Sequence, residues 1–294
     1  MHILITDSGV GGLSVCAYAE RFLRIHGIGE PVKLTYVNAS PENDFGYNSM
    51  DSRSEKLENF DRFLNIISDT FTPDSIYIAC NTLSVIFPDT EFSKTGDIPV
   101  QGILETGVNR LVRVLGRYPR SMVAIFGTPT TIEEKTYDHL LERNGIGGAR
   151  IVSQACPSLA DTISEDREGL RAKKKIEKYV DEVVVKSKER MTNFLAYLAC
   201  THYGYRENYF SAAFEERGLD AEVLNPNKFV IEDLFGKFEK NVSNIEGNND
   251  VRVEFITRYR IPETALETIA FFLDDVSRET VRAFKNYTHA PDLF

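Results

Sequence analysis

Two cysteines stand in matching sequence contexts, and they are the residues of this chain best suited to chemistry. Cys80 lies in the segment Tyr-Ile-Ala-Cys-Asn-Thr, and Cys200 lies in the segment Tyr-Leu-Ala-Cys-Thr-His. Each cysteine follows a short apolar run that predicts a buried strand, and small hydrogen-bonding residues follow directly. Two thiols presented alike can serve the two faces of one carbon atom, one removing a proton and the other returning one. The pattern favours a proton-transfer site built from two similar halves.

The residues beside the cysteines could bind a carboxylate and tune the thiols. Asn81, Thr82 and Thr201, together with backbone N–H groups, offer donors to an anion. A thiol at a helix N-terminus has a lowered pKa, so we expect an increased thiolate fraction at both cysteines. His202 could tune Cys200 or shuttle a proton. A histidine that lies on the surface or ends a strand is the alternative interpretation.

A third motif, Asp7-Ser8-Gly9-Val10-Gly11-Gly12, ends the first predicted strand and opens a helix. Parallel sheets bind ligands at the carboxyl ends of their strands, and a helix N-terminus favours an anion. The motif matches neither the Walker phosphate loop nor the dinucleotide-binding fingerprint. A simple turn with a helix cap is the alternative interpretation.

The remaining cysteines favour structural roles. Cys16 falls within a helical pattern and Cys156 lacks the polar neighbours of the other two, so both are expected to pack in the core. Four cysteines are too few for a disulfide framework, and we expect reduced thiols. The spacings Cys-x₂-Cys and His-x₃-His are both missing from the sequence, so it predicts no metal site.

Composition limits the class of protein. The 294 residues suffice for two domains, and the hydrophobic content of 42% can build their cores. A net charge of -10 argues against a nucleic-acid partner. No apolar run approaches the length of a membrane span, and the chain starts directly on a predicted strand, so we expect neither a membrane partner nor a signal peptide. The expected location is the cytoplasm.

The elements that must position the cysteines alternate between strand and helix. The first series has strands at 3–6, 32–37 and 75–79 and helices at 13–25 and 54–68. The second has strands at 100–104, 122–126, 150–153, 193–199 and 221–224, with helices at 108–115, 132–144, 167–190 and 230–238. A polar loop at 241–250, a candidate edge strand at 252–259 and a helical stretch at 262–284 follow.

This alternation predicts an α/β protein with two similar units, each built on a largely parallel sheet. The first domain is expected to comprise residues 1–98 and 221–294 and to carry Cys80. The second is expected to comprise residues 99–220 and to carry Cys200.

At these residues the chain resembles the aspartate/glutamate racemase superfamily, and within it the glutamate racemases. The resemblance rests on the motifs at 7–15, 79–82 and 199–203, which occur in the family's order and at family-like spacing. Further similar segments lie at 98–105, 127–131 and 155–157, and the similarity spans roughly residues 1–235.

The resemblance implies two α/β domains related by pseudo-two-fold symmetry, with the active site in the cleft between them. It implies an isomerase that needs no cofactor, in which Cys80 and Cys200 face opposite sides of the substrate Cα. Asp7 would assist Cys80, and His202 would assist Cys200. The substrate-binding residues implied are Asp7, Ser8, Phe45, Gly46, Asn81, Thr82, Thr128, Thr131, Thr201 and His202.

The implied reaction interconverts L- and D-glutamate and supplies D-glutamate for peptidoglycan, and hence for cell-wall biogenesis and cell shape. The partner would be the amino-acid substrate, and the family often forms homodimers. Three positions depart from the family pattern. Asp44-Phe45-Gly46 replaces Pro-Tyr-Gly, and Asn225-Pro226 replaces Asp-Ser. Ser164 stands where the family often has an auxiliary glutamate, and Glu165 follows it. A racemase of aspartate or a related substrate, and a non-catalytic amino-acid-binding protein on the same scaffold, therefore remain alternatives.

Overall fold

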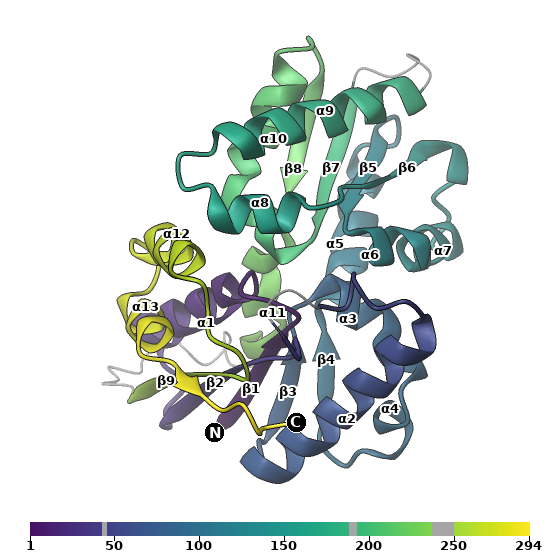
Figure 1. Cartoon of the computed structure of the whole chain (residues 1–294). Helices are drawn as coiled ribbons and strands as arrows, with labels where there is room; N and C mark the ends of the chain where they lie inside the picture. The colour runs from purple at the N-terminus through teal and green to yellow at the C-terminus, as the bar shows by residue number, and fades with distance from the viewer. Residues whose placement is uncertain (43–45, 188–192, 237–249) are drawn as a thin grey trace. The chain divides into compact units, whose positions relative to one another are not determined.

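The chain forms two compact α/β units. The computed structural model describes residues 1–42, 46–187, 193–236 and 250–294 (Figure 1). Unit 1 comprises Met1–Ile103 and Asn227–Phe294, and unit 2 comprises Leu104–Pro226. Each unit contains one sheet in which all paired strands are parallel. The predicted class, with two parallel-sheet α/β domains, is confirmed.

The sheet of unit 1 has the strand order β10-β9-β2-β1-β3-β4. Its strands are β1 (His2–Asp7), β2 (Val32–Asn38), β3 (Ser75–Ile78), β4 (Val100–Gly102), β9 (Val251–Thr257) and β10 (Thr288–His289). The central strand β1 is buried from Ile3 to Asp7. A parallel strand buried along its length needs helices on both faces of the sheet.

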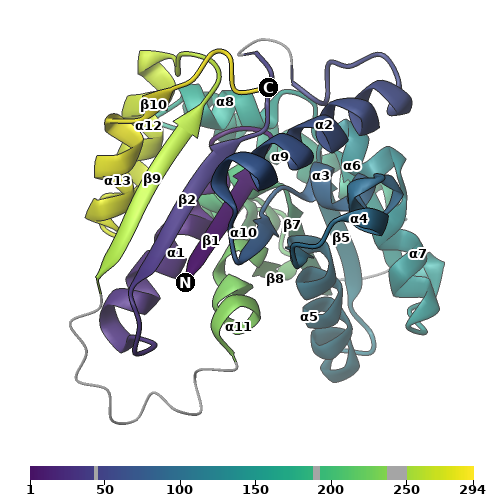
Figure 2. The same cartoon turned by 90° about the horizontal axis from the view of Figure 1, so that it is seen from below.

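Helices cover both faces of this sheet. They are α1 (Leu13–His26), α2 (Arg53–Phe71), α3 (Asn81–Ile86), α4 (Phe92–Thr95), α11 (Val230–Phe235), α12 (Glu263–Leu273) and α13 (Arg278–Lys285). The helix α1 packs with α11 and α13, whereas α2 packs with α4. Right-handed crossovers to strands on opposite sides of β1 put α1 and α2 on opposite faces of the sheet, as Figure 2 shows.

The sheet of unit 2 has the order β6-β5-β7-β8. Its strands are β5 (Met122–Gly127), β6 (Ile151–Ala155), β7 (Asn193–Ala199) and β8 (Asp220–Leu224). Its helices are α5 (Ile103–Arg117), α6 (Pro129–Glu133), α7 (Thr136–Arg143), α8 (Leu159–Glu165), α9 (Leu170–Lys186) and α10 (Glu207–Glu215). The Phe126 ring packs against Phe210 of α10, and the Tyr197 ring packs against Tyr137 of α7.

The two sheets repeat one strand order. The run β2-β1-β3-β4 in unit 1 corresponds to β6-β5-β7-β8 in unit 2, with the first strand of each series in the middle and the second and third on either side of it. Loops that follow corresponding strands therefore occupy corresponding positions in the two sheets.

Several predicted elements differ from the structure. The helix predicted at 132–144 is two helices, α6 and α7, because Lys135 adopts a left-handed conformation with φ of 52° between them. The helical stretch predicted at 262–284 breaks after Leu273, and Ser277 caps the new helix α13 by accepting from the Thr280 N–H. The strand β9 was expected at an edge, but β10 pairs with its outer side.

Other predicted segments are shorter or lie partly outside the described residues. The helical region predicted at 167–190 is one helix, α9, and the helix α8 before it was not predicted. The loop expected at 241–250 lies outside the described residues except for Asp250.

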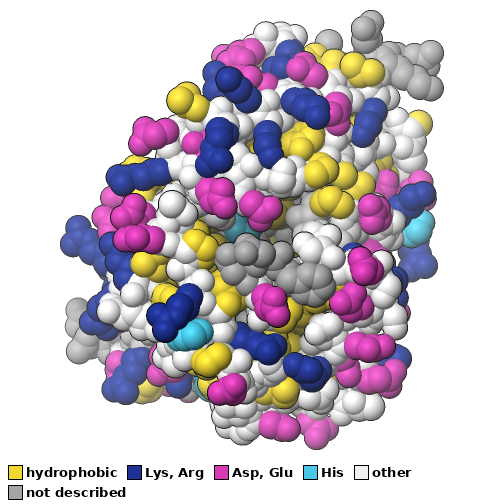
Figure 3. Space-filling model, viewed as in Figure 1, with side chains coloured by type: hydrophobic (Ala, Val, Ile, Leu, Met, Phe, Trp, Pro, Cys, Tyr) yellow, Lys and Arg dark blue, Asp and Glu magenta, His cyan; other side chains and the backbone are white. Residues whose placement is uncertain are grey.

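The surface over α9 mixes both signs of charge. Lys173 pairs with Glu177 and Lys178 pairs with Glu182, each four residues apart on the helix. Figure 3 shows basic and acidic side chains side by side over this part of unit 2. Among the residues that the structure describes, no helix has the length and apolar character needed to cross a membrane.

Candidate active site

Cys80 lies at the carboxyl edge of the sheet of unit 1. The strand β3 ends at Ile78, the Ala79 N–H donates to the Thr6 carbonyl, and Cys80 then precedes the short helix α3. The neighbouring strand β1 ends at Asp7, which is 1% exposed. The loop after it brings the Ser8 hydroxyl oxygen to 3.1 Å from the Cys80 sulfur.

The environment of Cys80 favours the neutral thiol. Burial raises its pKa to about 12, and the negative charge of Asp7 adds to this effect. Hydrogen bonds from the Ser8 hydroxyl and from the N–H groups of Leu83 and Ser8 lower the pKa but do not outweigh burial. The expected lowering of this thiol's pKa at a helix N-terminus is therefore wrong, because desolvation dominates over the N–H groups of a six-residue helix.

The loop carrying Asp7 is held by the strand ends around it. The Gly9 N–H donates to Asp7 Oδ1 at 2.8 Å, and the Tyr36 hydroxyl of β2 donates to the Gly9 carbonyl at 2.7 Å. Asn81 and Thr82, expected to bind substrate, are 1% and 2% exposed at the start of α3. These contacts hold the loop with Asp7 and the start of α3 beside the sulfur of Cys80.

One residue near Cys80 was not anticipated. Tyr47 is buried and packs edge-on against Phe60, and the nearby Cys80 helps burial to raise its pKa. Its hydroxyl has no hydrogen-bond partner within the described part of the chain. Its neighbour Gly46 is described, whereas Phe45 and Asp44 lie outside the described residues.

Cys200 occupies the corresponding place in unit 2. It follows β7, which pairs with β5 up to the register Gly127–Ala199, and precedes the 3₁₀ helix η3 (Thr201–Arg206). The sulfur of Cys200 lies 3.9 Å from Nδ1 of His202, and the Cys200 residue is 7% exposed. Cys80 and Cys200 thus each follow the third strand of their sheet.

The imidazole of His202 is kept neutral. Burial lowers the pKa of His202 to about 4, and the negative charge of Asp161 on α8 opposes this shift. The helix α8 packs against η3, so Asp161 reaches the histidine from a different segment of the chain. Asp161 was not among the residues predicted from the sequence.

The loop after β5 completes this half. Thr128 caps α6, its hydroxyl oxygen lies 3.0 Å from that of Thr131, and both residues are buried. The Cys156 N–H donates to the Gly127 carbonyl, so Cys156 follows β6 at the same sheet edge. Thr128, Thr131, Thr201 and Cys200 therefore gather at the carboxyl ends of β5 and β7, as the strand pattern predicted.

All four cysteines are free and buried, including Cys16 and Cys156. Within the described ranges, no group of three or more histidine, cysteine, aspartate or glutamate side chains could hold a metal ion.

Known proteins similar to this chain are glutamate racemases. No family model matches the chain. A glutamate racemase from Persephonella marina is 25% identical over 277 residues, covering 86% of this chain and 96% of that protein. These relatives support the aspartate/glutamate racemase superfamily for this chain, with the glutamate racemases as the similar members, and with it an isomerase of the amino-acid racemase class.

Solved members of the superfamily share the fold. The structure of glutamate racemase from Campylobacter jejuni has a TM-score of 0.70 and 22% identity, covering 93% of this chain and 98% of that one. The enzyme from Francisella tularensis, solved in complex with D-glutamate, has a TM-score of 0.68 and 20% identity, covering 94% and 95% of the two chains.

Proposed function

We propose that the protein is a glutamate racemase that inverts the Cα of glutamate without a cofactor, using Cys80 and Cys200 as its two acid–base groups. The observation that carries the proposal is the repeated placement of the two thiols, each at the carboxyl end of the third strand in a sheet of the same strand order. The glutamate racemases among its relatives support glutamate as the substrate.

The proposed reaction needs one thiolate and one thiol. The thiolate takes the Cα proton and becomes a thiol, leaving a carbanion, while the other thiol donates its proton to the opposite face and becomes a thiolate. No electrons are exchanged, and the reverse reaction uses the cysteines in swapped roles. The carbanion is the difficult species, so preorganised donors must stabilise its charge.

Side chains around each sulfur suit these roles. The Ser8 hydroxyl would stabilise the thiolate of Cys80, and Asp7 would keep that thiolate basic by raising its pKa. His202 is neutral and its Nδ1 lies 3.9 Å from the Cys200 sulfur, so it would assist Cys200 by hydrogen bonding to the sulfur. Substrate carboxylates and the amino group would bind to Ser8, Asn81, Thr82, Thr128, Thr131, Thr201 and the segment Phe45-Gly46.

The biological role that follows is the supply of D-glutamate for peptidoglycan. This part of the proposal rests on the substrate and on the family, since the known use of such a product is in the bacterial cell wall. The protein would act on the free amino acid.

Deuterium exchange tests the reaction. L-Glutamate incubated with the protein in D₂O, in the presence of a chelator and with no added cofactor, should lose its Cα proton and yield D-glutamate carrying deuterium. Proton NMR and chiral chromatography measure the two products. Aspartate under the same conditions should exchange far more slowly.

Substitution tests the two thiols. We expect Cys80→Ser and Cys200→Ser each to reduce racemisation by about 10²-fold or more, because each face loses its acid–base group. Cys16→Ala, which removes a thiol buried on α1, is the matched control and should keep most of the activity. Full racemisation by both serine variants would disprove the two-thiol mechanism, and no exchange with glutamate in the unsubstituted protein would disprove the substrate.

A further inference from the structure

The part of the chain beyond residue 250 reaches the edge of the sheet that carries half of the candidate site. The strand β9 pairs in parallel with β2 up to the register Val37–Ile256, and Figure 2 shows the two strands side by side. Because neighbouring parallel strands end at the same edge of a sheet, the residues after β9 lie beside those after β2. Asp7 and Cys80 lie at this same edge.

A hydrogen bond at this edge joins Tyr259 to Asn38, the last residue of β2. Asn38 Nδ2 donates to the Tyr259 hydroxyl oxygen at 2.9 Å, and Asn38 Oδ1 accepts from the Ser40 N–H at 2.9 Å. A backbone N–H can only donate, so Oδ1 must face Ser40 and Nδ2 must face the tyrosine. Asn38 is 0% exposed, so the loss of either contact is costly.

Tyr259 is itself held by the end of the chain. The Thr257 hydroxyl donates to the Tyr259 carbonyl at 3.3 Å. The Thr257 carbonyl accepts from the Ala290 N–H at 2.8 Å, directly after β10. The end of β9 is therefore fixed between β2 and β10, and Tyr259 presents its hydroxyl to Asn38 from a fixed backbone.

Asn38 connects this contact to a predicted substrate-binding residue. The hydrogen bond from the Ser40 N–H to Asn38 sets the turn that leaves β2. The Ser40 hydroxyl oxygen lies 3.0 Å from the position that a Cβ atom on Gly46 would take, so Ser40 and Gly46 are close together. Gly46 is one of the predicted substrate-binding residues, and its neighbour Tyr47 lies near Cys80. A displacement of Ser40 would therefore disturb Gly46.

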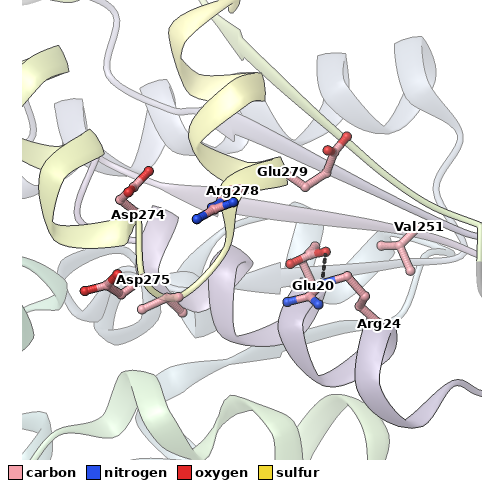
Figure 4. Close-up of a pocket in the computed structure, with 8 residues that line it drawn as sticks. Glu20, Arg24, Val251, Asp274, Asp275, Arg278 and Glu279 are labelled. Atoms are coloured by element: carbon pink, nitrogen blue, oxygen red, sulfur yellow. Dashed lines mark hydrogen bonds and ion pairs between the residues drawn. The ribbon is translucent and has the colours of Figure 1, made fainter.

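The amino end of β9 contributes to a different region of unit 1. Val251, the first residue of β9, lines a cavity of about 540 Å³ together with Glu20 and Arg24 of α1 (Figure 4). Glu20 is already paired with Arg24, and the residues that line this cavity are not those assigned to racemisation. The contact that bears on the candidate site is the one at the carboxyl end of β9.

We propose that Tyr259 is a positioning residue for substrate binding, which holds the turn after β2 through Asn38. The turn in its place keeps Ser40 against Gly46. This inference rests on the proposed function, in which the segment with Gly46 helps to bind the substrate. Because the substrate carboxylates keep their charge throughout racemisation, a loosened binding segment weakens the binding of substrate and transition state alike. The effect should fall on KM and leave kcat nearly unchanged.

Tyr259→Phe removes the hydroxyl alone. Initial rates of L-glutamate racemisation should show KM raised by about three- to tenfold, the range for one lost hydrogen bond, with kcat changed by less than about twofold. An unchanged KM would overturn the inference.

Tyr287→Phe is the matched control. The Tyr287 hydroxyl accepts from the Ile261 N–H at 3.1 Å in the same part of unit 1, so its loss should leave KM unchanged. Both variants leave one donor without its acceptor, so a rise in KM confined to Tyr259→Phe does not come from general destabilisation. An equal rise in KM in the two variants would contradict the inference.

A double-mutant cycle tests the route through Asn38. Asn38→Ala removes the side chain that Tyr259 holds, so it should raise KM by itself, and adding Tyr259→Phe should then raise KM by less than about twofold. Two effects that multiply in full would show that Tyr259 does not act through Asn38. If Asn38→Ala does not fold, Asn38→Asp takes its place: its carboxylate can accept from both Ser40 and Tyr259, so adding Tyr259→Phe should raise KM, and an unchanged KM would contradict the route.

Calorimetry separates this inference from the proposed function. An equimolar mixture of L- and D-glutamate keeps its composition in the presence of a racemase, so its Kd can be measured with the active protein. We expect Kd to rise in Tyr259→Phe by the same factor as KM and to stay unchanged in Tyr287→Phe. A protein that binds the mixture but does not racemise L-glutamate would refute the proposed function alone, and the two Kd values would still decide the role of Tyr259. A Kd that does not rise in Tyr259→Phe would overturn the inference even in an active racemase.

Discussion

His202 shows how a residue's protonation follows from its surroundings. Burial lowers its pKa to about 4, so at neutral pH the ring carries no charge and can hydrogen-bond to the sulfur of Cys200 through Nδ1. Because the folded-state pKa lies below the ordinary value, the folded state disfavours the imidazolium. Protonation of His202 therefore destabilises the protein as the pH falls from about 6.5 toward 4.

Asp161 should control the position of that titration. Its negative charge raises the pKa of His202 against the effect of burial, so Asp161→Asn should lower the pKa further. The imidazole resonances followed by NMR between pH 3 and 8 measure the change. Glu165→Gln is the matched control on the same helix, since Glu165 lies beside Arg171 and is not among the causes of the His202 shift. If Glu165→Gln changes the pKa of His202 more than Asp161→Asn does, Asp161 is not the carboxylate that raises this pKa.

The sequence predicts the site residues that lie inside a motif better than those that reach it from elsewhere. Cys80, Asn81 and Thr82 are consecutive, so the strand end that places one places all. Asp161 lies near His202, and Tyr47 lies near Cys80, because separate segments of the chain pack together. Nothing in the local sequence of Asp161 or Tyr47 indicates these contacts. The departure from the family pattern at Ser164 and Glu165 concerns a carboxylate on the same helix, α8, but it does not identify Asp161.

The junction between β1 and α1 depends on a glycine for space. A Cβ atom on Gly12 would lie 2.8 Å from Asp7 Cβ, 2.9 Å from Asp7 Oδ2 and 3.1 Å from Ala79 Cβ. The backbone of Gly12 is right-handed helical, so alanine is conformationally acceptable there and only the contacts forbid it. The glycine lets the start of α1 approach the strand ends that carry Asp7 and Cys80.

Gly12→Ala should therefore move Asp7 and destabilise the protein by about 1–3 kcal/mol through overpacking. Gly116→Ala is the matched control, because nothing lies within 4 Å of its added Cβ in α5 and alanine is the better helix former. The control should be stabilised by about 0.5–1 kcal/mol. Urea unfolding measures both changes, and a Gly12→Ala variant as stable as the unsubstituted protein would contradict the packing argument.

Strands were more predictable than helix ends. The strand β7 lies at Asn193–Ala199, as its apolar run predicts, because a parallel strand buried on both faces reads as continuous hydrophobic sequence. The break between α6 and α7 depends on a left-handed Lys135, a residue with no preference for that conformation. The break between α12 and α13 coincides with Ser277, whose capping role is visible only once the turn is known.

Buried thiols make the whole molecule sensitive to alkali. Burial raises the pKa of both Cys16 and Cys80 to about 12, above the ordinary value near 9. A raised folded-state pKa means that the unfolded chain releases protons first, so stability is full below about pH 9 and declines as the pH rises toward 12. Buried Cys156 and Tyr203 also have raised pKa values and act in the same direction.

The free energy of unfolding should fall between about pH 9 and pH 11, with a slope that approaches about 1.4 kcal/mol per pH unit for each such thiol. Urea titrations under reducing conditions measure it. Cys16→Ala removes one of the groups, so its stability should fall less steeply with pH than that of the unsubstituted protein. A free energy that stays flat or rises over this range would contradict the assignment of these groups as buried and protonated.

Unit 1 is built from two separate stretches of the chain, and this affects the order in which the two units can fold during synthesis. The strand β9 pairs with β2 and then receives β10, yet both are synthesised after the whole of Leu104–Pro226. Unit 2, which is continuous, can fold while these strands are still being made, whereas the first hundred residues must wait with the outer side of β2 uncovered. An unpaired strand side is a template for association, so this waiting period is when nascent chains are most exposed to aggregation and most dependent on chaperones.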